Sequence, residues 1–231
     1  MKELLTAGLS ALQLPSEGIP SLERYAELLV EKNKVMNLTA ITEPKDIATL
    51  HFLDCAALLT LADFRGKKVA DVGTGAGFPG MPLRILEPDM DITLLDSLNK
   101  RIDFLKEVCA ELGLADVHCV HGRAEEFAAD HREDYDIVTS RAVANLSMLS
   151  ELCLPYAKVG GTFLSMKSVS SGAELEQAAH AIKLMGGRLG DSVDYTIPGT
   201  DVTHRVLTIH KVAPTLKGYP RRWAKIQKDP L

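Results

Sequence analysis

A glycine-rich segment, residues 73–80, directly follows an apolar run that ends in Asp71. A helical pattern then leads to a second apolar run, which ends in Asp96. Glycines let a backbone approach a ligand closely, and an acid at the end of the next strand can accept hydrogen bonds from ribose hydroxyls. The pattern is typical of nucleoside-cofactor binding, although Asp96 could also hydrogen-bond the start of the following helix. The candidate ligand contacts in this first turn are Asp71, Gly73, Gly75, Gly77 and Phe78.

Polar residues also stand at the ends of the later apolar runs. Ala124 and Glu125 follow the third run, Arg141 follows the fourth and Lys167 ends the fifth. The carboxyl ends of parallel strands meet at one edge of a sheet, so we expect these residues to lie near the glycine turn. Two alternatives remain open, because Glu125 could simply occupy the first turn of a helix and Arg141 could form a surface ion pair.

Strand and helix patterns alternate from residue 68 onward. The predicted strands are Lys68–Val72, Asp91–Asp96, Val117–His121, Tyr135–Ser140, Thr162–Lys167, Ser192–Ile197 and His204–Val212. The predicted helices are Pro79–Leu86, Leu98–Leu112, Glu125–Ala129, Leu146–Lys158 and Ala173–Met185. Alternation predicts a parallel sheet covered on both faces, and the last two strands, with no helix between them, predict a hairpin. This α/β layout, a mostly parallel seven-stranded sheet with a C-terminal hairpin, is that of the Rossmann-like class I methyltransferases.

The first sixty-odd residues have helical periodicity. They are predicted to form a helical extension, residues 1–66, packed on a core of residues 67–231. We expect one helix after Pro20, with Ser21 as its N-cap, and a second helix over residues 44–61.

Two polar segments lie in this extension. Residues 33–39 form a polar break between the two predicted helices. His51 and Asp54 lie three residues apart in the second helix and therefore share one face of it. We interpret them as a polar pair on the helix face rather than as a catalytic dyad.

Composition excludes several classes of protein. With 231 residues, of which 46% are hydrophobic, the chain suits one large globular domain or a domain with an extension. No apolar run approaches the roughly 20 residues that span a bilayer, and the N-terminus has no leader pattern, so we expect a cytoplasmic protein without a membrane partner. The four cysteines are widely spaced and form no CxxC pair, which indicates reduced thiols and no metal site.

The C-terminal tail is basic, although the formal net charge of the chain is −5. A locally basic tail on an acidic body can contact phosphates, but it can equally be a solvated terminus. Tyr219 and Trp223 in this tail could stack on nucleic-acid bases or pack onto the domain. The basic residues of the tail are Lys217, Arg221, Arg222, Lys225 and Lys228.

Several of these segments together resemble one family, the bacterial RsmG (GidB) 16S ribosomal RNA guanine-N7 methyltransferases. The resemblance covers nearly the whole chain, and the combination of motifs is far more specific than the glycine turn alone. The segments that carry it are Asn33–Thr39, His51–Asp54, Asp71–Leu83, Leu95–Arg101, Ser140–Ala142, Met166–Lys167 and Tyr219–Arg221.

The resemblance implies S-adenosylmethionine as the cofactor and one guanine of 16S rRNA, in the small-subunit loop near the decoding site, as the substrate. It implies that 16S rRNA or the small ribosomal subunit is the partner, and we expect the protein to act as a monomer. The implied cofactor contacts are Gly73, Phe78, Ala124, Glu125 and Arg141, with Asp96 on the ribose by analogy of fold. The candidate RNA contacts are Lys34, Asn37, His51, Lys167, Arg221 and Arg222.

The chemistry of the implied reaction requires no catalytic base. Guanine N7 carries an exposed lone pair, so it can attack a methyl group without losing a proton, and catalysis can rest on positioning. We therefore name no general base and take Arg141 and Lys167 as candidates for positioning the substrate. A nicotinamide-dependent oxidoreductase and a non-enzymatic RNA-binding factor remain as alternative classes.

Overall fold

The computed structural model describes residues 1–141, 144–169 and 172–231. Within these ranges seven strands form one sheet in the order β3-β2-β1-β4-β5-β7-β6. Strands β1 to β5 are parallel to their neighbours, whereas β7 is antiparallel to both β5 and β6. This confirms the predicted mostly parallel sheet and its C-terminal hairpin. The strands are β1 (Lys68–Val72), β2 (Asp91–Asp96), β3 (Val117–His121), β4 (Tyr135–Arg141), β5 (Ala157–Ser168), β6 (Gly187–Thr196) and β7 (Thr203–Lys211).

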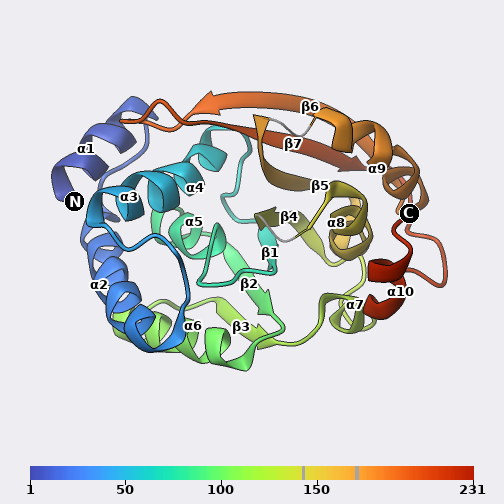
Figure 1. The fold of residues 1–231 in the computed structure, drawn as a ribbon, viewed down its shortest axis with the longest axis horizontal. Helices are drawn as coiled ribbons and strands as arrows, with labels where there is room; N and C mark the ends of the chain where they lie inside the picture. Colours follow the sequence, from blue (N-terminus) through green and yellow to red (C-terminus); the bar gives the residue numbers. More distant parts are fainter. Residues whose placement is uncertain (142–143, 170–171) are drawn as a thin grey trace.

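Both faces of the sheet are buried. In β1, Val69 belongs to one hydrophobic cluster and its neighbours Ala70 and Val72 to another, because alternate residues of a strand point to opposite faces. Figure 1 shows helices α1 to α6 on one side of the sheet and α7 to α10 on the other. The two-sided covering explains why almost every residue of the central strands β1, β2 and β4 is buried, whereas the edge strand β3 is only partly buried.

Each parallel crossover of the core contains a helix. Helix α6 ends at Gly113, which has φ of 62°, as the sequence predicts for a helix stop. The predicted helix over residues 146–158 is too long: α8 ends at Cys153, and Pro155 lies in a short 3-10 turn before β5. Proline lacks the N–H that a continuing helix needs. The helices are α5 (Gly80–Leu86), α6 (Asn99–Leu112), α7 (Ala124–Phe127), α8 (Leu146–Cys153) and α9 (Gly172–Leu184).

The N-terminal segment is helical as predicted, with one boundary to correct. Helix α2 begins at Ile19 after Gly18, so Ser21 is not its N-cap; Pro20 occupies the first turn, where its missing N–H has no cost. The second predicted helix is a continuous helical run with a π-helical turn at its centre. Its parts, with the preceding helix, are α1 (Lys2–Ala11), α3 (Pro44–Asp46), the π turn (Ile47–Leu53), α4 (Asp54–Ala56) and a 3-10 turn (Ala57–Thr60).

The helical extension and the sheet share one hydrophobic core. Tyr25 and Phe52 from the extension lie in the same buried cluster as Phe78 and Leu94 from the sheet region. The division at residue 66 therefore stays a prediction.

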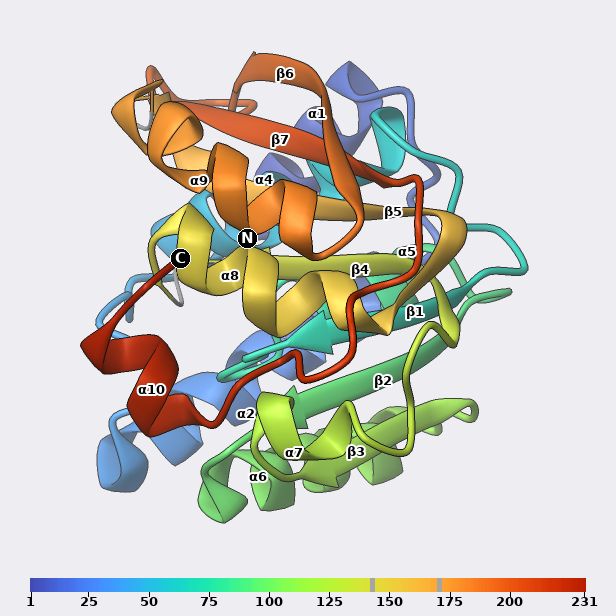
Figure 2. The same cartoon turned by 90° about the vertical axis from the view of Figure 1, so that its right-hand side faces the viewer.

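The chain ends in a tail, residues 212–231, that crosses to the side of the sheet opposite the N-terminus. Its last helix, α10 (Trp223–Lys228), lies beside α7 and α8 in Figure 2. Ile226 is completely buried there and fixes α10 to the core.

Candidate functional site

The glycine turn is built around the buried carboxylate of Asp71. The Thr74 hydroxyl and the Gly80 N–H donate to its Oδ2 at 2.6 and 2.9 Å, and Thr139 donates to Oδ1 at 3.3 Å. Burial raises the pKa of Asp71 to about 6, although the three donors oppose the shift. The Asp71 carboxylate therefore shapes the turn from inside.

Glycine is required in this turn for two different reasons. Gly73, Gly75 and Gly77 have φ of 74°, 63° and 108°, where other residues are strained. A methyl group on Gly75 would meet no atom within 4 Å. A methyl group on Gly77 would lie 2.6 Å from the Tyr25 hydroxyl oxygen and 2.8 Å from Leu105 Cδ2. Gly75 is thus open to a ligand, whereas Gly77 is needed for packing.

Asp96, at the end of β2, connects the turn to the next helix. Its Oδ2 accepts from the Gly75 N–H at 2.9 Å and from Arg101 at 3.2 Å. Its Oδ1 accepts from the Leu98 N–H at 2.9 Å, at the start of α6. The predicted contact to the start of the helix is confirmed, whereas the predicted contact to a ribose stays a prediction, for which Asp96 lies beside the glycine turn.

Two clefts meet at the glycine turn and share Gly73, Asp96 and Ser97. An elongated ligand can therefore lie across both. The tail-side cleft, of about 280 Å³, is lined by Val72, Gly73, Leu95, Asp96, Ser97, Gly122, Arg123, Ala124, Glu125, Leu152 and Trp223. The helix-side cleft, of about 380 Å³, is lined by Leu38, Thr39, His51, Gly73, Thr74, Gly75, Ala76, Phe78, Asp96, Ser97, Arg101 and Arg141.

The clefts bring together most of the predicted cofactor residues. Asp71 and Gly77 are the exceptions, because they support the turn from behind and are not among the residues lining either cleft. Sequence reasoning did not single out Ser97 and Arg101, although both lie in the segment Leu95–Arg101 that carries the family resemblance, and it missed Leu152, which lies in no motif. The predicted residues that line the clefts are Gly73, Gly75, Phe78, Asp96, Ala124, Glu125 and Arg141.

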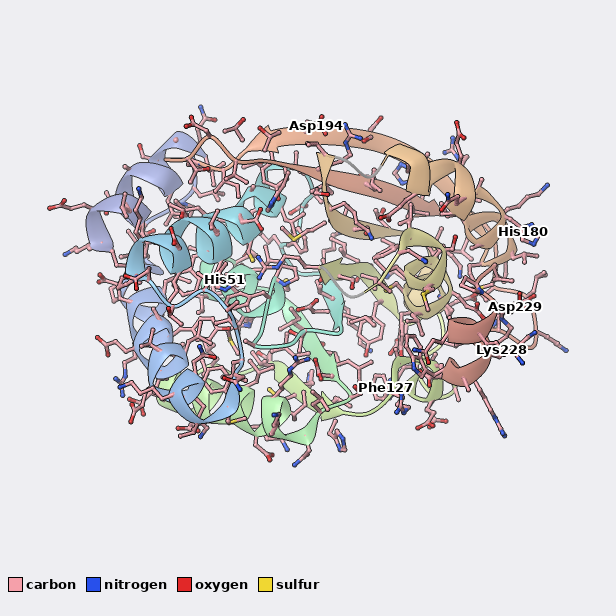
Figure 3. All side chains as sticks on the ribbon, viewed as in Figure 1. His51, Phe127, His180, Asp194, Lys228 and Asp229 are labelled. Carbon is pink, nitrogen blue, oxygen red and sulfur yellow. The ribbon has the colours of Figure 1, made fainter. Side chains whose placement is uncertain are left out.

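Arg141, Phe78 and His51 form a stacked group in the wall of the helix-side cleft. The His51 and Phe78 rings stack with centroids 4.1 Å apart, and the Arg141 guanidinium lies 4.9 Å from the Phe78 ring centre. Arg141 Nη2 contacts His51 Nδ1 at 3.0 Å, and His51 Nε2 contacts the Thr39 hydroxyl at 2.9 Å. Figure 3 shows His51 well inside the outline of the molecule.

Asp54 is the centre of a buried polar network behind this group. Its carboxylate is completely buried and accepts from Arg141 at 3.1 Å, Tyr195 at 2.7 Å and His204 at 2.8 Å. Burial would raise the pKa of Asp54, but the His204 hydrogen bond and the Arg141 charge outweigh it and hold the pKa below its usual value. His51 and Asp54 thus each contact Arg141 and do not form a dyad with each other. The ion pair of Arg141, which the sequence left open as a surface pair, is buried.

The two histidines of this network should titrate in opposite directions. Burial, and then the Arg141 charge, lower the pKa of His51 to about 3, whereas the hydrogen bond to Asp54 raises the pKa of His204. The contribution of His51 to the free energy of unfolding is therefore complete above pH 6.5 and is progressively lost as the pH falls toward 3. The His204 contribution is complete below pH 6.5 and is lost as the pH rises through its folded pKa.

Histidine-selective NMR between pH 5 and 9 measures this difference directly. We expect the His51 ring signals to stay constant, at the neutral form, while those of His204 titrate above 6.5. A His51 ring that becomes protonated near pH 6.5 would contradict the proposed network.

Two of the predicted RNA-contacting cations are already paired. The Lys167 ammonium lies 2.9 Å from Glu174 and donates to the Ala144 carbonyl at 2.6 Å. Arg221 makes a two-pronged ion pair with Glu151, whose side chain is only 1% exposed. Both cations therefore have structural partners that a nucleic acid would have to displace.

Of the remaining predicted RNA contacts, His51 is buried and held between Arg141 and Thr39, whereas the other three are open. Lys34, Asn37 and Arg222 are all exposed, and Asn37 ends α2 directly before the cleft residue Leu38. Ala142, the last residue of the predicted Ser140–Ala142 motif, lies outside the described residues.

Residues 1–141, 144–169 and 172–231 contain neither a metal-ligand cluster nor a membrane-spanning helix. No group of three histidine, cysteine or acidic residues in those ranges could hold a metal ion. No helix there is both long and apolar enough to cross a bilayer.

The sheet order, the glycine turn and the acid at the end of β2 define a class I methyltransferase fold. TrmN from Thermus thermophilus is similar, with a TM-score of 0.54 and 22% identity over 68% of this chain and 48% of that one. M. jannaschii TYW2 in complex with AdoMet is also similar, with a TM-score of 0.55 and 14% identity over 69% of this chain and 75% of that one. At these identities the similarities concern the fold.

Sequence comparisons then identify the family. The family model for rRNA small subunit methyltransferase G, GidB, matches residues 18–194, and this chain belongs to that family. The ribosomal RNA small subunit methyltransferase G of Clostridium botulinum (strain Loch Maree / Type A3) is 48% identical over 90% of this chain and 88% of its own length. The protein of the same name from Alkaliphilus oremlandii is 45% identical over 100% of this chain and 99% of its own length. The predicted family and its class of enzyme, a methyltransferase, are confirmed.

Proposed function

We propose that this protein transfers a methyl group from S-adenosylmethionine to N7 of one guanine in 16S rRNA, in the small-subunit loop near the decoding site. The observation that carries the proposal is the junction at Asp96, where an open glycine turn and two connected clefts meet in a member of this family. We propose further that it acts as a monomer in the cytoplasm, where small ribosomal subunits are found.

The cleft residues fit such a cofactor. A carboxylate has about four acceptor positions, so Asp96 retains capacity for a ribose hydroxyl besides its contacts to Gly75, Leu98 and Arg101. Gly75 leaves room for a ligand beside the turn. When bound, S-adenosylmethionine supplies an activated methyl group that a nucleophile can accept.

Side chains at the site would orient the reactants and would not remove a proton. Guanine N7 already carries a lone pair, so we assign no general base. Both cations are paired, Arg141 with Asp54 and Lys167 with Glu174, but only Arg141 lines one of the two clefts at the glycine turn and is therefore better placed to position the substrate. The exposed residues Lys34, Asn37 and Arg222 stay candidates for contacts to RNA phosphates.

Methyl transfer to small ribosomal subunits tests this function. Subunits purified from a strain that lacks the enzyme are incubated with the protein and isotopically labelled S-adenosylmethionine, and the 16S rRNA is digested and analysed by mass spectrometry. We expect one labelled methyl per subunit, as N7-methylguanosine. Subunits from the strain with the enzyme serve as the control and should take up almost none. Label at another atom, or no label, would overturn the assignment.

A further inference from the structure

Trp223 lies in the wall of the tail-side cleft. It is the only tryptophan of the chain, and it lines the tail-side cleft together with Ala124 and Glu125. Its backbone N–H lies 3.3 Å from Glu125 Oε1. The tail therefore supplies part of the wall of a cleft whose other walls come from the sheet.

The chemistry of this cleft suits a flat heteroaromatic base. Its aliphatic lining residues are Val72, Leu95, Ala124 and Leu152, and Trp223 adds an aromatic side chain. The cleft extends from Asp96, which would hold the ribose, to Ala124 and Glu125. A base attached to that ribose would lie between these apolar groups, where stacking and burial stabilise it.

Specific polar contacts hold the tail in place. The Arg221 N–H and Nε each donate to Glu151 Oε1 at 2.8 Å, and Arg221 Nη2 donates to Oε2 at 2.6 Å. The Arg132 guanidinium donates to the carbonyls of Thr215, Leu216 and Tyr219 at 2.6 to 3.0 Å. Because Glu151 is buried in α8, releasing Arg221 would leave an unpaired charge there. Trp223 follows two residues later, so this ion pair fixes where α10 starts.

We infer that the C-terminal tail, residues 212–231, completes the binding site for the adenine base of the cofactor, with Trp223 as the packing residue and the Arg221–Glu151 pair as its anchor. This inference rests on the proposed function, since it takes S-adenosylmethionine as the ligand. It replaces the interpretation of Trp223 as a residue that stacks on RNA bases.

The lone tryptophan provides a direct probe of this inference. Titration of the full-length protein with S-adenosylhomocysteine should change the Trp223 fluorescence in a saturable way, with a dissociation constant equal to that from calorimetry. Trp223→Ala should raise this constant about tenfold or more, and Trp223→Phe should raise it less, because base–aromatic stacking contributes on that scale. Lys228→Ala is the matched control, since Lys228 is exposed on the same helix and lies at the outer edge of the molecule in Figure 3; its constant should not change.

A second measurement separates the cofactor role from an RNA role and from misfolding. For Trp223→Phe, the KM for S-adenosylmethionine should rise, while the KM for small ribosomal subunits and the thermal melting curve should stay unchanged. The opposite pattern, with only the subunit KM raised, would assign Trp223 to RNA. Wild-type protein that binds S-adenosylhomocysteine with unchanged tryptophan emission, and a Trp223→Ala affinity within twofold of wild type, would overturn the inference alone. Wild-type protein that binds no S-adenosylhomocysteine would instead overturn the proposed function.

Discussion

Gly77→Ala should lower the stability of the protein severely, whereas Gly75→Ala should chiefly lower ligand affinity. At Gly77 the new methyl group meets the Tyr25 hydroxyl and Leu105 at distances below 3 Å, and φ of 108° is strained for alanine. Strain and overpacking each contribute about 1–3 kcal/mol, so we expect a loss of about 3 kcal/mol or more in the free energy of unfolding. For a chain of this size that lowers Tm by about 6–12 °C.

Gly75→Ala is the matched control for that prediction. Its methyl group enters open space, so the cost is the left-handed backbone alone, about 1–2 kcal/mol. Because Gly75 lines the helix-side cleft, the methyl group should also weaken the binding of S-adenosylhomocysteine. Thermal denaturation and calorimetry on both variants measure the two effects. Equal melting temperatures for the two variants would refute the assigned packing role of Gly77.

Asp54→Ala should have an effect on stability of similar size. It removes the carboxylate that accepts hydrogen bonds from Arg141, Tyr195 and His204, and it leaves the Arg141 charge without its partner in a largely buried position. Removing one partner of a buried ion pair costs about 3–5 kcal/mol. Urea denaturation should show this as a lower midpoint with an unchanged slope.

A double-mutant cycle with Arg141→Met isolates the ion pair. The double variant buries no unpaired charge from this pair, so it should lose less stability than the sum of the two single variants. A coupling free energy of about 1 kcal/mol or more is expected. Additive losses, within about 0.5 kcal/mol, would show that the Asp54–Arg141 contact does not stabilise the fold. Arg141→Met should in addition weaken cofactor binding, because Arg141 lines the cleft.

Local spacing made the glycine turn and Asp96 predictable. The turn and the acid belong to one strand–helix–strand unit, and the geometry of such a unit places the end of β2 beside the turn. The Asp54 network could not be predicted in the same way. Asp54 is 87 residues from Arg141 and 150 residues from His204, and no periodic pattern connects residues that meet only through the order of strands in the sheet.

Charge counting in the basic tail could not show which cations are paired. Five cations and one acid left phosphate contact and a solvated terminus equally open, whereas in the structure Arg221 is paired with Glu151, 70 residues away. One signal was present: Glu151 is the only acid in the apolar helix Leu146–Cys153. A carboxylate on a helix that packs against the sheet needs a cation, and the tail supplies it.

Calorimetry with S-adenosylhomocysteine and with NAD, on the wild type and on Asp96→Ala, shows whether the glycine turn and Asp96 hold S-adenosylmethionine. We expect the wild type to bind S-adenosylhomocysteine and not NAD. The variant should bind it about 10- to 100-fold more weakly, because hydrogen bonds to a charged group contribute about 1.5–3 kcal/mol. Binding of NAD with no response to S-adenosylhomocysteine, or an Asp96→Ala affinity equal to that of the wild type, would contradict the account.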